Sequence, residues 1–177
     1  MIVGRSAEPD FSEVGAAISK SLSEDEIGSM GLDGLSAFDR AVLAVGGESR
    51  LLEMISWENE WVAAESGLVF VRSSVWAVSL LTPTGKCIVF VDHDKTTVSR
   101  VRGAVSDPTA EIPPKLGNVD ALRIANDQGY LFKSVRQPPR LVIEAVDGRN
   151  LPVWDLPYVD RSFAPVRIDA ISGQRIR

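Results

Sequence analysis

The chain has 177 residues, of which 45% are hydrophobic and 24% charged, a composition typical of globular proteins that excludes a disordered chain. Its one cysteine, Cys87, excludes an internal disulfide. No stretch approaches the roughly 18 consecutive apolar residues of a membrane span, and the N-terminus lacks an apolar run of signal-peptide length. The sequence therefore predicts a cytoplasmic protein.

The net charge of −5 is unevenly distributed. Residues 1–66 hold 13 acidic and 4 basic residues, whereas residues 67–117 hold 4 and 6, and residues 118–177 hold 7 and 9. An acidic region disfavours nucleic acid and attracts cationic partners. A solvated helix surface would give the same pattern. The small basic excess near the C-terminus is too weak to indicate nucleic-acid binding.

Residues 10–66 have the pattern of N-terminal helices. Asp10 and Ser23 each precede a glutamate by three residues, which is capping-box spacing. A further helix is predicted after Asp33 and ends at the Gly46-Gly47 pair. Another is predicted from Glu48, although Trp57 and Trp61 would also suit an early strand. The apolar positions of these last two helices are Leu35, Phe38, Val42 and Val45, and then Leu51, Leu52, Ile55 and Val62.

From Gly67 onwards the pattern predicts strands. The runs 75–81 and 87–91 flank a Thr-Pro-Thr-Gly turn and form a predicted hairpin, and their nearly uniform apolar character predicts that both faces are covered. Residues 103–117, rich in proline and glycine, form a predicted connector. The remaining predicted elements are a strand at 68–71, a helix from Asn118 to Gly129, and strands at 140–146, 153–159 and 164–170.

A Val-Trp strand occurs twice, at Val75-Trp76 and at Val153-Trp154. Each is followed by an apolar strand that ends in an aspartate, 16 residues after the tryptophan in the first case and 15 in the second. The order and spacing favour a duplication over chance recurrence. We therefore expect an α+β fold in which N-terminal helices precede two antiparallel β-meanders, each preceded by a helix and pseudo-duplicated. The expected segments are 1–102, the connector 103–117, and 118–177, packed as one compact unit.

Residues 118–177 resemble a PepSY-type domain. The resemblance lies in the runs Asp120–Ala125, Arg140–Ala145, Val153-Trp154 and Val166–Gly173. Ser172 stands where that family usually has threonine, and residues 34–100 would be a degenerate further copy. The resemblance implies a small α+β scaffold that binds or inhibits partners, often peptidases, and that has no catalytic residues of its own.

Chemical motifs are scarce. His93, the one histidine, lies between Asp92 and Asp94 and could contribute to a metal site, but neighbours in an extended chain point to opposite sides. A turn at the end of the hairpin explains these residues better. Cys87 lies inside an apolar strand and is expected in the core rather than as a nucleophile. No phosphate-binding glycine loop or serine-hydrolase motif is present.

The first functional hypothesis is a non-catalytic protein-binding or inhibitory protein that needs no cofactor. A concrete form is a cytoplasmic immunity protein that neutralises a basic bacterial toxin or effector, since acidic surfaces speed association with basic partners. An alternative is a metal-dependent module or small enzyme centred on Asp92-His93-Asp94. A third is a structural subunit of a larger assembly. The predicted partner contacts are Trp57, Glu58, Glu60, Trp61 and Glu65, although the two tryptophans could equally belong to the core.

Overall fold

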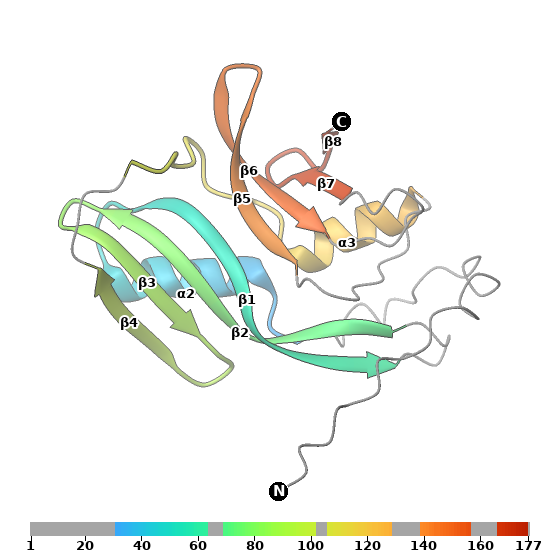
Figure 1. Ribbon diagram of the computed structural model, residues 1–177, viewed down its shortest axis with the longest axis horizontal. Coiled ribbons are helices and arrows are strands. Elements are labelled where there is room, and N and C mark those ends of the chain that lie inside the picture. Colours follow the sequence, from blue (N-terminus) through green and yellow to red (C-terminus); the bar gives the residue numbers. More distant parts are fainter. Residues whose placement is uncertain (1–30, 64–68, 102–105, 129–138, 157–165, 177) are drawn as a thin grey trace, which may run out of the picture.

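The structure is a computed structural model that describes residues 31–63, 69–101, 106–128, 139–156 and 166–176. Within these ranges the chain forms two α-helices and eight β-strands (Figure 1). The helices are α2 (Gly34–Val45) and α3 (Asn118–Asp127). The strands are β1 (Arg50–Ala63), β2 (Val69–Thr82), β3 (Gly85–Val91), β4 (Thr96–Val101), β5 (Arg140–Val146), β6 (Arg149–Leu156), β7 (Val166–Asp169) and β8 (Arg175–Ile176).

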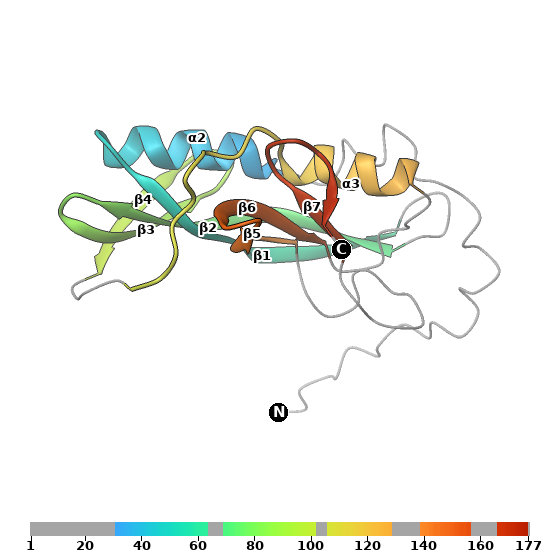
Figure 2. The same ribbon diagram turned by 90° about the horizontal axis from the view of Figure 1, so that it is seen from above.

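The eight strands form one antiparallel sheet in the order β4-β3-β2-β1-β5-β6-β7-β8. Strands β1–β4 form one half of the sheet and strands β5–β8 form the other. The two halves meet where β1 pairs with β5. Both helices lie against the same face (Figure 2). We call this the helix face, and we call the opposite one the open face.

The core lies between the helices and the helix face. One row of directly paired residues crosses all eight strands on this face, and its six inner members are fully buried. Ala37, Phe38 and Ala41 from α2 and Ala121 and Ala125 from α3 belong to the same core. The row consists of Val98, Val89, Val78, Met54, Leu141, Trp154, Ile168 and Arg175.

Helix α2 follows the predicted pattern. The Asp33 side chain caps its first turn by accepting hydrogen bonds from the main-chain N–H groups of Leu35 and Ser36. Gly46 ends the helix with φ of 68°, and its N–H donates to the carbonyl of Val42. The prediction of a helix between Asp33 and Gly46 is confirmed.

The helix predicted from Glu48 is wrong, because these residues form the long strand β1. The ladder between β1 and β2 contains register shifts between Leu51 and Glu53 and around Glu58. Each β-bulge adds a residue and interrupts the two-residue alternation of a strand. Consequently Leu51 and Met54 both face the core at a spacing of three, which is helical in the sequence.

The predicted α+β fold class is also wrong. The described residues form mainly a single eight-stranded antiparallel sheet with two helices, rather than N-terminal helices followed by two separate three-stranded meanders. The strands β4 and β8 were not predicted, because each is short and β4 is rich in polar residues. The helix starts predicted at Asp10 and Ser23 lie outside the described residues.

Two tryptophans occupy matching positions in the two halves. Trp76 on β2 donates its indole N–H to the carbonyl of Leu32 at 2.7 Å, and Trp154 on β6 donates to that of Leu116 at 2.8 Å. Each carbonyl lies just before a helix, so each tryptophan ties its strand to the start of the helix in its own half. The two rings also meet edge to face, with centroids 5.7 Å apart.

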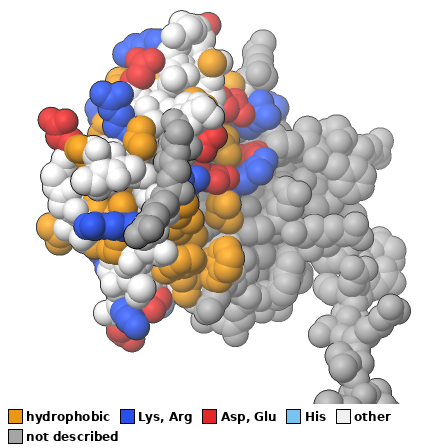
Figure 3. Space-filling model, turned by 60° about the vertical axis from the view of Figure 1, so that its left-hand side comes forward, with side chains coloured by type: hydrophobic (Ala, Val, Ile, Leu, Met, Phe, Trp, Pro, Cys, Tyr) orange, Lys and Arg blue, Asp and Glu red, His pale blue; other side chains and the backbone are white. Residues whose placement is uncertain are grey.

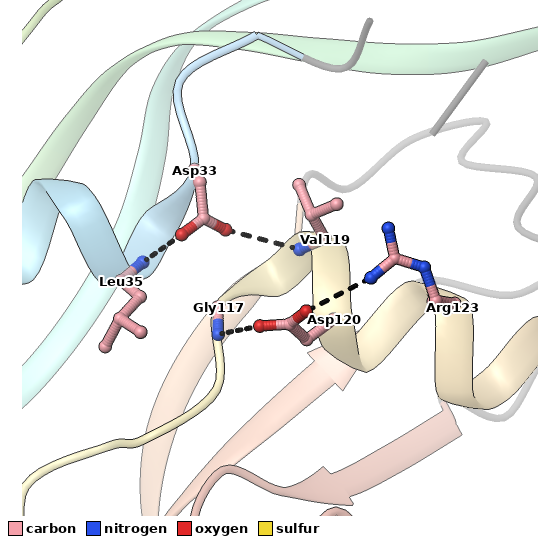
Figure 4. Close-up of polar contacts among 6 residues, drawn as sticks. All are labelled: Asp33, Leu35, Gly117, Val119, Asp120 and Arg123. Atoms are coloured by element: carbon pink, nitrogen blue, oxygen red, sulfur yellow. Dashed lines mark hydrogen bonds and ion pairs between the residues drawn. The ribbon is translucent and has the colours of Figure 1, made fainter. Parts of the chain in front are cut away.

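The N-termini of the two helices meet and share their caps (Figure 4). The main-chain N–H of Gly34 in α2 donates to Asn118 Oδ1 at 2.6 Å, and the Asp33 carboxylate also accepts a longer hydrogen bond from the N–H of Val119 in α3. Asn118, the first residue of α3, therefore caps α2. In α3 the Asp120 carboxylate reaches back to the N–H of Gly117.

Candidate binding surface

The open face carries a second row of paired residues, shifted by one position from the core row. It begins with Thr97 and continues with an apolar stretch and then a charged stretch. The apolar members come from β3, β2 and β1, and the charged members from β5, β6 and β7. The row is Thr97, Phe90, Ala77, Ile55, Arg140, Asp155, Arg167 and Ile176.

Trp57 is the most exposed aromatic residue among the described side chains, with 63% of its surface accessible. Its ring meets Phe90 edge to face, with centroids 5.6 Å apart and an interplanar angle of 78°. Such a pair contributes roughly 0.5–1.5 kcal/mol beyond the burial of its surface. The contact therefore holds the Trp57 ring in place while leaving most of it open to solvent.

The charged stretch pairs exposed guanidinium groups with more buried carboxylates. Arg140 Nε and Nη2 each lie 2.8 Å from Asp155 Oδ2, and the Arg140 side chain is 48% exposed against 8% for Asp155. Arg167 contacts Glu144 in the same way, at 3.4 Å. Within the described structure, Asp155 Oδ1 is buried without a hydrogen-bond partner. The positive charges of Arg140 and Arg167 are thus largely balanced by carboxylates of β6 and β5.

Seen with the β4 end of the molecule forward, hydrophobic side chains gather into a patch with charged groups around it (Figure 3). Burial differs between the two faces of β3. On the helix face Cys87, Val89 and Val91 are buried, whereas on the open face Ile88 and Phe90 are only half-buried. The prediction that both faces of this strand are covered is wrong. On β2 both faces are covered at Trp76–Leu80.

The predicted contact residues have different outcomes. Trp57 is exposed on β1 beside the open-face row. Glu58, Glu60 and Trp61 also belong to β1, which corrects their predicted helical setting, and their side chains lie outside the described part of the structure. Glu65 falls between the described segments.

Sequence reasoning missed Phe90, Ile55, Arg140 and Arg167 as members of this surface. Phe90 was assigned to a strand with both faces buried, because nothing in an all-apolar run distinguishes its two faces. Arg140 and Arg167 were counted only toward a basic C-terminal excess. Their alignment with Ile55 depends on the pairing of β1 with β5, which joins residues 85 positions apart and has no local sequence signal.

Asp92, His93 and Asp94 form the turn between β3 and β4. Asp92 Oδ1 accepts hydrogen bonds from the main-chain N–H groups of Lys95 and, at 2.8 Å, of Asp94. These bonds, from Lys95 first, hold the pKa of the Asp92 carboxyl below its ordinary value of 3.8, with a smaller contribution from the Arg40 charge. Asp169 accepts from Ile171 N–H in the same way at 2.8 Å.

This geometry gives Asp92 a role in holding the turn. One oxygen already accepts two main-chain hydrogen bonds, and His93 is exposed. Among the described side chains, no three His, Cys, Asp or Glu residues are grouped so as to hold a metal ion. Cys87 is buried, as predicted.

Replacing Asp92 with asparagine is expected to lower the melting temperature most at neutral pH. The folded-state pKa is depressed, so the ionised carboxylate stabilises the fold above pH 3.8 and this contribution is lost as the pH falls through the folded pKa. Melting curves from neutral to strongly acidic pH should therefore show the two proteins converging in acid. Asp92→Ala is the control, because it removes the hydrogen-bond acceptor and should therefore remain less stable than the wild type at every pH. A gap that stays constant for Asp92→Asn would contradict this account.

Comparison with protein families, with curated proteins and with solved structures found no match to this chain. The resemblance of residues 118–177 to a PepSY domain therefore stays a prediction. Neither of the two described helices is long and apolar enough to cross a membrane.

Proposed function

We propose that this protein is a non-catalytic protein-binding protein, and that its contact surface is the open face around Trp57. The observation that supports this most directly is a tryptophan that is 63% exposed yet held by an edge-to-face contact with Phe90. Tryptophan is enriched among residues that dominate binding energy at protein interfaces. A ring that is already oriented loses less conformational freedom on binding than a mobile one.

The strand that carries Trp57 also supports a basic partner. β1 contains the acidic residues Glu53, Glu58 and Glu60 against one basic residue, Arg50. The neighbouring Arg140 is paired with Asp155, so it adds little net positive charge. The concrete form of the proposal is an inhibitor that neutralises a basic bacterial toxin or effector, as an immunity protein does, because an acidic surface accelerates encounter with a basic one.

The test begins with recovery of the full-length protein from its native host and identification of any stoichiometric partner. Trp57→Ala is then expected to weaken binding of the purified partner by about 30-fold, which corresponds to a hot spot of about 2 kcal/mol. Leu43→Ala is the matched control, because Leu43 is also an exposed apolar residue but lies on α2. Isothermal titration calorimetry would measure both affinities.

Two results would count against the proposal. One is the absence of any stoichiometric partner, including the product of a neighbouring gene. The other is an identified partner whose affinity falls as much with Leu43→Ala as with Trp57→Ala, because binding would then not depend on the open face.

A further inference from the structure

Among the strands that the structure describes, β4 lies at the edge of the sheet. It pairs with β3 on one side, and it is the first strand in the order of the sheet (Figure 1). Residues Thr97–Val101 are all exposed. The main-chain groups that point away from β3 are therefore accessible to another strand.

This edge lacks most of the features by which proteins prevent strands from pairing. Its ladder with β3 runs from Thr96 to Val101 without a register shift, so no bulge twists it away. It contains no proline, and Arg100 is its one charged residue. Val98 and Val101 are 39% and 41% exposed, and four of the six residues are β-branched. The other edge of the sheet, β8, is two residues long.

We propose that β4 pairs antiparallel with β4 of a second copy of this chain. Side chains of opposed residues must share a face, which restricts the possible registers. A two-fold axis at Val98 satisfies this condition and keeps α2 of both copies on one side. It places Val98 opposite Val98, Thr97 opposite Ser99, and Thr96 opposite Arg100. No like charges oppose each other directly, and the two Val98 side chains come into contact.

The protein already uses this kind of junction within one chain. β1 and β5 join the two halves of the sheet through an antiparallel pairing in which only Met54–Leu141 and Ile55–Arg140 are directly paired. A β4 pairing would extend the sheet in its own plane, so the open face around Trp57 would stay accessible. Because a strand of six residues buries a small area, we expect a weak dimer that depends on concentration.

A charge-exchange experiment at Val98 tests the proposal. The wild-type mass in sedimentation equilibrium should rise from 19.2 kDa towards twice that value with concentration. Val98→Glu and Val98→Lys should each weaken the dimer about tenfold or more, because like charges would then oppose each other. An equimolar mixture of the two variants should restore dimerisation. Unchanged circular dichroism and melting curves would establish that both variants fold.

The mixture is the decisive readout, because a general effect of charge on solubility would not be reversed by combining two altered proteins. A wild-type protein that stays monomeric at every concentration would overturn the proposal. So would a wild-type dimer that persists unchanged in both single variants, because its interface would then lie elsewhere.

Discussion

Replacing Trp154 with alanine is expected to lower the free energy of unfolding by about 3–5 kcal/mol. Trp154 is fully buried in the core row of the sheet, contacts the Trp76 ring, and donates its indole N–H to the carbonyl of Leu116. The substitution leaves a cavity and an unpaired carbonyl at once. Domains of this size are typically stable by about 5–15 kcal/mol, so the loss is a large fraction of the total.

Trp57→Ala is the matched control, because it removes the same side chain from the opposite face of the sheet. We expect it to cost about 0.5–1.5 kcal/mol, since Trp57 is mostly exposed and loses mainly its contact with Phe90. Urea denaturation followed by far-ultraviolet circular dichroism measures both without relying on tryptophan fluorescence. Equal losses in the two variants would contradict the assignment of Trp154 to the core and of Trp57 to the surface.

Gly117→Ala is expected to destabilise the protein by about 1–3 kcal/mol. At many positions this substitution stabilises by restricting the unfolded chain. Here a Cβ atom would overlap the Asp33 carboxylate, which caps α2 and also accepts from the N–H of Val119. The Asp33 side chain would have to move, and both helices would lose a hydrogen bond at their first turn.

A double-mutant cycle with Asp33→Ala separates this cause from others. If the overlap with the carboxylate explains the loss, Gly117→Ala should cost much less once Asp33 is alanine, and the two effects should not add. Urea denaturation of the wild type, both single variants and the double variant gives the coupling. Additive effects would mean that Gly117 is required for another reason.

Local patterns predicted the elements whose neighbours in space are also neighbours in sequence. The helix between Asp33 and Gly46 has a regular apolar face and a glycine stop, and the hairpin of β2 and β3 has a proline-glycine turn. Strand β1 was missed because its bulges bring core residues to a helical spacing. The pairing of β1 with β5 at Met54–Leu141 was missed because pairing between strands far apart in the sequence leaves no periodic signal in it.

The candidate surface was predicted only in part for the same reason. Trp57 was selected for its residue type, which is independent of the element that carries it. Its partner Phe90 and the neighbouring Arg140 come from other strands, and only the pairing of β3, β2, β1 and β5 brings them together. A surface assembled from several strands requires the sheet order before its members can be named.

The shared caps at Asp33 and Asn118 bear on how the protein unfolds. The first N–H of α2 is bonded to a side chain of α3, and the Asp33 carboxylate at the start of α2 serves the first turn of α3. Trp76 and Trp154 cover each other at the same junction. Opening one half would therefore leave main-chain donors unpaired and a buried indole exposed in the half that stayed folded. Because the stability of each half depends on this junction, we expect the two halves to lose their structure together in one cooperative step rather than in succession.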